Sequence, residues 1–212
     1  MASAGDVNGD GYSDVIAGTP LYDKGHEGVA FVWMGKADGI KAITNLKLEK
    51  DKPEALFGLS VAGAGDVNGE GYSDITIGAS QLTKTPYQGA AFLYYGNSSG
   101  ILSGAIAKEI LPSDKKQIST HSTAILASGA GDLNGDGFGD IIFGSYQYKY
   151  GASELTWGTA LVYYGSRTGS IKNNLRLYNS NLTTIINQSQ KAKTALEQDC
   201  MQNLFWEAAR AS

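Results

Sequence analysis

The chain has 212 residues, a formal net charge of −4 at pH 7 and a single cysteine. This length allows one or two ordinary domains, and the one cysteine excludes both an intrachain disulfide and a cysteine-based zinc site. The negative charge, with no cluster of basic residues, argues against a nucleic-acid-binding surface. The 28 glycines and 12 tyrosines are typical of many short strands joined by tight turns, so we predict an all-β fold.

A ten-residue motif occurs three times along the chain. It is GDVNGDGYSD at residues 5–14, GDVNGEGYSD at 65–74 and GDLNGDGFGD at 131–140. The leading aspartates, Asp6, Asp66 and Asp132, are 60 and then 66 residues apart. That period is too long for one hairpin and about right for a four-stranded unit, and a fixed period decides the fold prediction for the whole chain.

Each motif leads into the same series of predicted elements. A short β-branched segment follows it and predicts a strand at 15–18, 75–78 and 141–144. The next strand is apolar on both faces, as in a sheet sandwiched between other sheets, at 28–35, 89–96 and 158–165. Polar turns at 36–39, 97–100 and 166–169 then predict a hairpin to outer strands near 42–48, 105–111 and 171–177.

The ends of the repeat array are less regular. Inner strands are predicted before the second and third motifs, at 57–62 and 124–127, whereas only four residues precede the first motif, so we expect its inner strand to be missing. Residues 182–186 could supply that strand, in the same chain or in a partner. Residues 189–209 carry apolar side chains every four positions, which predicts an amphipathic helix packed on its own domain, on a twin chain or on a foreign partner. The predicted domains are therefore 1–187 for the repeats and 188–212 for the helix.

The motif places oxygen donors at alternate positions. In its first copy, Asp6, Asn8, Asp10 and Asp14 occupy positions 1, 3, 5 and 9, and Tyr12 at position 7 offers its main-chain carbonyl. Oxygen-only donors favour calcium and, less readily, magnesium. A glycine-rich turn without metal is the alternative, which three fully occupied loops disfavour. The predicted calcium ligands, about three ions per chain, are Asp6, Asn8, Asp10, Tyr12, Asp14, Asp66, Asn68, Glu70, Tyr72, Asp74, Asp132, Asn134, Asp136, Phe138 and Asp140.

The motif differs from an EF-hand beyond its first half. Position 12, where an EF-hand has a bidentate glutamate, is Ala17, Ile77 or Phe143 inside a predicted strand. The aspartate at position 9 must then complete the coordination shell. In the middle loop Glu70 replaces an aspartate, and its longer side chain predicts the lowest affinity of the three loops.

These residues resemble the FG-GAP repeats of the integrin α-subunit β-propeller and its bacterial relatives. The Phe-Gly of the name matches Phe57-Gly58, and the Gly-Ala-Pro position reads Gly18-Thr19-Pro20 in the first repeat. The resemblance covers residues 1–178. It implies propeller blades, calcium on the loop between the first two strands of a blade, a role in adhesion or ligand recognition, and an extracellular or cell-surface location.

Three repeats are fewer than such propellers use, since family members usually close with about seven blades. The chain is therefore either a fragment or a unit that completes a ring by oligomerisation, with a dimer of six blades favoured. The first residues carry no secretion signal, and no apolar stretch of about 18 residues predicts a membrane span.

We predict no enzymatic activity, no catalytic residues and no cofactor other than calcium. A G-x-S-x-G match at 96–100 falls in a predicted strand hairpin rather than between a strand and a helix, and His26 and His121 lie on connections. Two other functions stay open. One is a carbohydrate-binding propeller, suggested by Tyr87, Tyr146, Tyr148 and Tyr150 in predicted blade connections. The other is a structural self-assembly unit without an external ligand.

Overall fold

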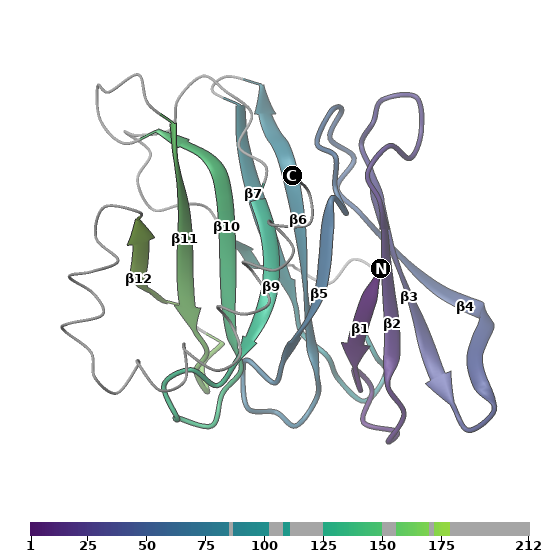
Figure 1. Cartoon of the computed structure of the whole chain (residues 1–212). Helices are drawn as coiled ribbons and strands as arrows, with labels where there is room; N and C mark the ends of the chain where they lie inside the picture. Colours follow the sequence, from purple (N-terminus) through teal and green to yellow (C-terminus); the bar gives the residue numbers. More distant parts are fainter. Residues whose placement is uncertain (85–86, 102–107, 111–124, 150–155, 170–171, 179–212) are drawn as a thin grey trace, which may run out of the picture.

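The computed structural model describes residues 1–84, 87–101, 108–110, 125–149, 156–169 and 172–178 (Figure 1). These residues form twelve strands in three four-stranded antiparallel sheets, which confirms the predicted all-β class. Among them no helix is long and apolar enough to cross a membrane. The predicted strand at 182–186 and the predicted helix at 188–212 lie outside the described residues.

Each sheet contains one copy of the motif and has its strands in simple sequence order, as expected for a propeller blade. The first blade is β1 (Ala2–Gly5), β2 (Asp14–Thr19), β3 (Val29–Lys36) and β4 (Gly39–Glu49). The second is β5 (Ser60–Gly65), β6 (Asp74–Lys84), β7 (Tyr87–Tyr94) and β8 (Lys108–Ile110). The third is β9 (Ile125–Gly131), β10 (Asp140–Lys149), β11 (Thr156–Tyr164) and β12 (Lys172–Tyr178).

The prediction that the first blade lacks its inner strand is wrong. The strand β1 pairs with β2 in the register Ala2↔Ile16 and Ser3↔Val15. Four residues are sufficient because the motif loop turns the chain back directly after Gly5, which places it opposite Asp14. The first sheet is therefore complete in its strand order.

The inner strand of the second blade begins later than the sequence predicts, at Ser60 rather than Phe57. Phe57 instead makes a parallel bridge with Gly28 of the first blade, and its side chain is fully buried. Gly58 follows with a φ of +86°, a left-handed conformation that interrupts an extended strand. The Phe-Gly pair thus connects two blades rather than starting a strand.

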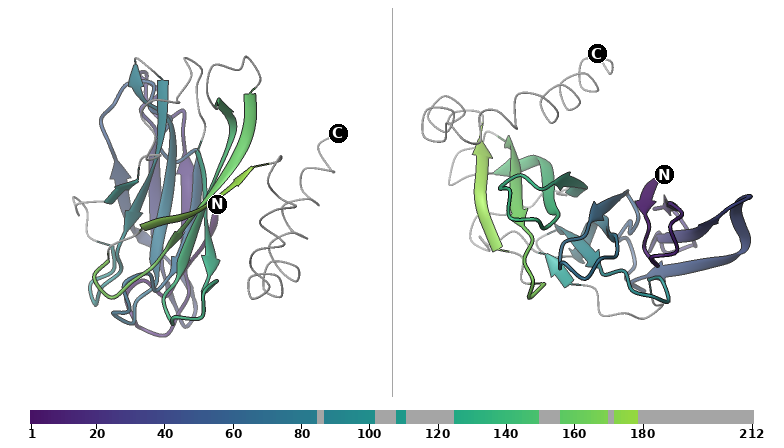
Figure 2. Two further views of the ribbon diagram at one scale, coloured as in Figure 1. Left: turned by 90° about the vertical axis from the view of Figure 1, so that its left-hand side faces the viewer. Right: turned by 90° about the horizontal axis from the view of Figure 1, so that it is seen from below.

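The three blades stand side by side, and Figure 2 shows from below that they form an arc. The innermost strands are neighbours, since β1 contacts β5 and β5 contacts β9. All three motif loops lie at the same end of the molecule, the lower end in Figure 1, because each one joins an inner strand to the second strand of its blade.

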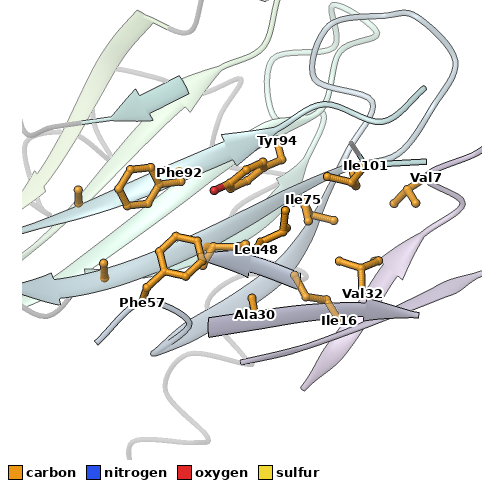
Figure 3. Close-up of a cluster of buried hydrophobic side chains, with 14 residues drawn as sticks. Val7, Ile16, Ala30, Val32, Leu48, Phe57, Ile75, Phe92, Tyr94 and Ile101 are labelled. Atoms are coloured by element: carbon orange, nitrogen blue, oxygen red, sulfur yellow. The ribbon is translucent and has the colours of Figure 1, made fainter. Parts of the chain in front are cut away.

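Apolar side chains fill the space between adjacent blades. Figure 3 shows the cluster between the first two, where Ile16 and Val32 face Ile75 and Phe92. Along β7, Ala90, Phe92 and Tyr94 belong to this cluster, while Ala91 and Leu93 belong to the cluster shared with the third blade. Tyr95, directly after the strand, is partly buried and packs against that second cluster. The second blade is therefore buried on both faces, as its continuous apolar run predicts. Each fully buried large side chain contributes roughly 1.5–3 kcal/mol.

Candidate metal-binding loops

The first aspartate of each motif organises its loop through backbone amides. Oδ1 of Asp6 accepts hydrogen bonds from the amides of Gly9 at 2.7 Å and Asp10 at 3.1 Å, and Oδ2 accepts one from Gly11 at 2.8 Å. Gly11 has a φ of +88°, which only glycine adopts readily. The loop therefore folds around one carboxylate.

The third loop repeats this arrangement around Asp132, with the amides of Gly135, Asp136 and Gly137 at 2.7, 3.1 and 2.8 Å. Burial acts to raise the pKa of Asp132, but these amides stabilise its ionised form and lower the pKa below the ordinary value. The carboxylate of Asp132 is thus held in its charged form.

Positions 3 and 5 form two further turns in the first loop. The side-chain carbonyl of Asn8 accepts from the amide of Asp10 at 3.0 Å, and Oδ1 of Asp10 accepts from the amide of Tyr12 at 3.0 Å. Both turns recur in the third loop. In the middle loop Asn68 still accepts from the amide of Glu70 at 3.1 Å, but within the described residues Glu70 makes no matching bond to the amide of Tyr72.

The aspartate at position 9 has a structural role that the sequence did not reveal. Oδ2 of buried Asp14 accepts from the amide of Val7 at 2.8 Å, and Oδ1 accepts from the amide of Gly35 at 2.7 Å. It therefore ties the start of the loop to the end of the third strand. Asp74 and Asp140 make the equivalent bonds, to Val67 and Gly96 and to Leu133 and Gly165, at 2.7 to 2.9 Å.

Burial disfavours the ionised form of these three carboxylates. Burial raises the pKa of Asp14, and the neighbouring carboxylates of Asp10 and Asp6 raise it further. Burial raises the pKa of Asp74 to about 7, and that of Asp140 is raised for the same reason. A divalent cation beside these groups would favour their ionised forms.

The donors present fit the chemistry of a calcium ion. Each loop offers three carboxylates, an asparagine amide and a main-chain carbonyl, which are all oxygen ligands. A carboxylate that accepts amide hydrogen bonds keeps further lone pairs for a cation. Within the part of the chain that the structure describes, no three carboxylate, imidazole or thiol groups lie close enough together to hold a metal ion. Calcium binding therefore stays a prediction from the donor set.

Comparison with known proteins identifies the repeats. The family profile described as FG-GAP repeat matches residues 2–33 and 126–156, which contain the first and third motifs. The chain belongs to the FG-GAP repeat family. The second motif, at residues 65–74, lies outside the matched segments, yet its loop has the same Asp66 and Asp74 hydrogen bonds as the other two FG-GAP loops.

Integrin alpha subunits are among the relatives of this FG-GAP chain. Human integrin alpha-7 is 30% identical over 145 residues, which is 66% of the chain and 11% of that relative. Integrin alpha-4 of Xenopus laevis is 31% identical over 147 residues, 68% of the chain and 14% of the relative. Integrin alpha-6 of Gallus gallus is 32% identical over 148 residues, 66% of the chain and 12% of the relative. The chain thus spans about a seventh or less of the length of these relatives.

The structure describes two of the three other features that the sequence singled out. Gly96 to Gly100 lies after β7 in a turn closed by a hydrogen bond from the amide of Gly100 to the carbonyl of Asn97, at 2.7 Å, as in a strand hairpin. His26 is exposed and lies 3.5 Å from Glu54. His121 lies outside the described residues.

The tyrosines proposed for carbohydrate binding are placed differently from the prediction. Tyr87 begins β7, and Tyr146 and Tyr148 lie in β10 rather than in blade connections. Both strands extend further than predicted because their pairing continues to Lys84↔Tyr87 and Lys149↔Thr156. Tyr150 lies outside the described residues.

Proposed function

We propose that the chain is a calcium-binding, non-enzymatic module of the integrin-like propeller type, which acts in adhesion or ligand recognition at the cell surface. The observation that carries the proposal is the repeated loop: three copies of one all-oxygen donor set at the same end of the blades (Figure 1). Family membership and the integrin alpha relatives support it.

Calcium in these loops would stiffen the end of the molecule. The loops carry buried or closely spaced carboxylates whose mutual repulsion a divalent cation offsets, and each position-9 aspartate connects its loop to the third strand of the blade. A ligand that binds only the folded chain adds about 2.7 kcal/mol of stability at a hundredfold excess over its dissociation constant. A rigid end of this kind suits a surface that recognises a partner.

Isothermal titration of the calcium-free chain with calcium chloride tests the metal part of the proposal. Three binding events per chain are expected, and the double variant Asp6→Asn/Asp10→Asn should retain two. Asp38→Asn is the matched control, because it removes the same kind of charge at an exposed residue paired with Lys36 outside the loops. The absence of binding heat with the unaltered chain at millimolar calcium would refute calcium binding.

Adhesion is tested separately by coating a surface with the chain and counting attached cells. We expect cells to attach in the presence of calcium and to detach when EGTA is added. Equal attachment to the calcium-free chain would contradict the proposed role of the loops. Binding to a broad glycan array would instead favour the carbohydrate-binding alternative.

A further inference from the structure

Each motif loop contains an asparagine followed directly by a glycine, at positions 3 and 4 of the motif. The pairs are Asn8-Gly9, Asn68-Gly69 and Asn134-Gly135, and they are the only Asn-Gly pairs in the sequence. An asparagine loses its side-chain amide most readily before a glycine, because glycine places no Cβ atom beside the main-chain nitrogen that attacks the asparagine side chain. The same chemically reactive pair is therefore present in all three loops.

The glycine of each pair is required by the loop itself. Gly9, Gly69 and Gly135 have φ values of +73°, +73° and +75°, a left-handed conformation that other residues rarely adopt. Space is also restricted in the first two loops. A Cβ atom added to Gly9 would lie 2.9 Å from the ring of Tyr72, and one added to Gly69 would lie 2.5 Å from the ring of Phe138. Replacing the glycine would remove the reactive pair only at the cost of the loop geometry.

The reaction of an Asn-Gly pair needs no reagent except water. The main-chain nitrogen of Gly9 would attack the side-chain carbonyl carbon of Asn8, so that a new C–N bond forms and the bond from that carbon to Nδ2 breaks. Nδ2 leaves as ammonia and takes up the proton that the Gly9 nitrogen gives up. Water then adds to either carbonyl carbon of the resulting succinimide ring and opens it, which gives aspartate or isoaspartate.

The folded loop opposes this reaction at the attacking nitrogen. The N–H group of Gly9, which must lose its hydrogen, donates to Oδ1 of Asp6 at 2.7 Å. The N–H groups of Gly69 and Gly135 donate to the first aspartate of their own motifs at the same distance. Hydrogen bonds to a carboxylate are stronger than those between neutral groups. Ring closure in any of the three loops therefore breaks a charge-assisted hydrogen bond.

The asparagine side chain is held as well. Nδ2 of Asn8 donates to Oδ2 of Asp10 at 3.0 Å, and Nδ2 of Asn134 donates to Oδ2 of Asp136 at 2.9 Å. The side-chain carbonyl oxygen accepts a hydrogen bond from the amide at position 5 in all three loops. The middle loop adds burial, since Asn68 is only 7% exposed, which limits the access of water. Both reacting groups of each pair are thus restrained by the closed loop.

We propose that Asn8, Asn68 and Asn134 are sites of spontaneous deamidation, which the closed loop suppresses. Opening of a loop frees the glycine N–H group and the asparagine side chain together, and the conversion then proceeds without an enzyme. Each hydrogen bond to a carboxylate that ring closure must break slows the reaction by about tenfold or more.

The product does not restore the original loop. An aspartate at position 3 adds a negative charge beside the carboxylates of Asp6 and Asp10 in the first loop. Isoaspartate carries the main chain through its own Cβ atom, so the oxygen donors that follow are displaced relative to those that precede it. Deamidation would therefore leave a permanent record that the loop has opened. The inference is independent of calcium binding, because all the protecting hydrogen bonds join atoms of the chain itself.

Peptide mapping by mass spectrometry tests the proposal on the full chain. The chain is incubated at mildly alkaline pH, folded in buffer or unfolded in guanidinium chloride, and peptides with asparagine, aspartate and isoaspartate are separated by chromatography. All three Asn-Gly pairs should convert in the unfolded chain, and their conversion should be about tenfold slower or more in the folded chain. Asn97, which is followed by Ser98, is the internal control and should convert more slowly than the pairs in the unfolded chain.

Two reciprocal variants assign the protection to the first aspartate of the motif. Asp6→Ala removes the acceptor of the Gly9 N–H group and should speed the conversion of Asn8 in the folded chain by about tenfold or more, with Asn134 unchanged. Asp132→Ala should have the opposite pattern, with Asn134 faster and Asn8 unchanged. The unaltered loop of each variant reports that the chain is still folded.

Two outcomes overturn the proposal. Equal conversion rates in the folded and unfolded chains would show that the closed loops give no protection. An Asn8 rate that Asp6→Ala leaves unchanged would show that the hydrogen bond to the aspartate is not the cause. Neither outcome bears on calcium binding, which the calcium titration measures separately.

Discussion

The aspartate at position 9 of the motif connects its loop to the segment at the end of the third strand of the same blade. Oδ2 of Asp74 accepts a hydrogen bond from the backbone amide of Val67 in its own loop, and Oδ1 accepts one from the amide of Gly96, which lies just after β7. The sequence predicts this residue as a metal ligand from spacing alone. Its second partner could not be predicted, because it is 22 residues away and depends on how the third strand folds back.

Asp74→Asn should destabilise the folded chain even without calcium. An asparagine has one oxygen that accepts and one NH2 group that only donates. One of the two backbone N–H groups, that of Val67 or that of Gly96, would therefore face the NH2 group and lose its acceptor. We expect the free energy of unfolding to fall by about 1–3 kcal/mol. Urea denaturation in EGTA measures it, with Asp38→Asn as an exposed control; equal midpoints for all three proteins would contradict the structural role.

The raised pKa of Asp74 predicts the pH dependence of stability in EGTA. Its folded pKa is about 7, above the ordinary 3.8, so between these values the folded chain binds more protons at this site than the unfolded chain. The contribution of Asp74 to stability should therefore be present at about pH 4 and be lost as the pH rises through 7. Urea denaturation between these pH values, compared with Asp74→Asn, isolates it. If the difference in the free energy of unfolding between the two proteins does not change with pH, the predicted pH dependence is contradicted.

Glu70 distinguishes the middle loop from its neighbours. In the first and third loops the aspartate at this position accepts from the amide two residues later, at 3.0 Å in both, and Glu70 does not. Glu70→Asp should restore that turn and raise the calcium affinity of the weakest site by about tenfold, the equivalent of one net hydrogen bond. Calcium titration measures the change. If the affinity of the weakest site is the same in Glu70→Asp, Glu70 is not the cause of its weak binding.

Among the elements, the strands that follow the motifs were predictable because each is an apolar run bounded by glycine and polar turns. The prediction failed where that pattern is absent. The four residues of β1 are too few to carry a period, and Phe57 is apolar yet bridges to Gly28 before β5 begins. The polar second halves of β6 and β10 form because the partner strands continue alongside them, as in Thr83↔Gln88 and Tyr148↔Trp157.

Gly96, which lies just after β7, is required for the close approach of the first and second blades. A Cβ atom on Gly96 would overlap the carbonyl oxygen of Ser73 and lie 2.7 Å from that of Val7 in the preceding blade. Gly96→Ala should therefore cost about 1–3 kcal/mol of stability. Gly144→Ala is the control, because a Cβ there meets nothing within 4 Å. Thermal denaturation compares them, and equal stabilities would show that the junction yields to an added methyl group.

For the molecule as a whole, loops and blade junctions are built from the same residues. Asp6 and Val7 belong to the first motif loop, and their carbonyl oxygens receive the amides of the second blade. An ion that orders a loop would then also order the junction to the next blade. The sequence predicts the repeats and their donors, but this coupling arises only from the arrangement of the blades in space.

The most direct measurement is the melting temperature of the full chain in EGTA, in millimolar magnesium and in millimolar calcium. Calcium held in three loops should raise it by several degrees, since 1 kcal/mol corresponds to about 2–4 °C for a chain of this size. Magnesium should raise the melting temperature less, because it requires near-octahedral coordination and loses its water ligands less readily than calcium does. Identical melting temperatures in EGTA and in calcium would contradict the proposal that these loops are calcium sites.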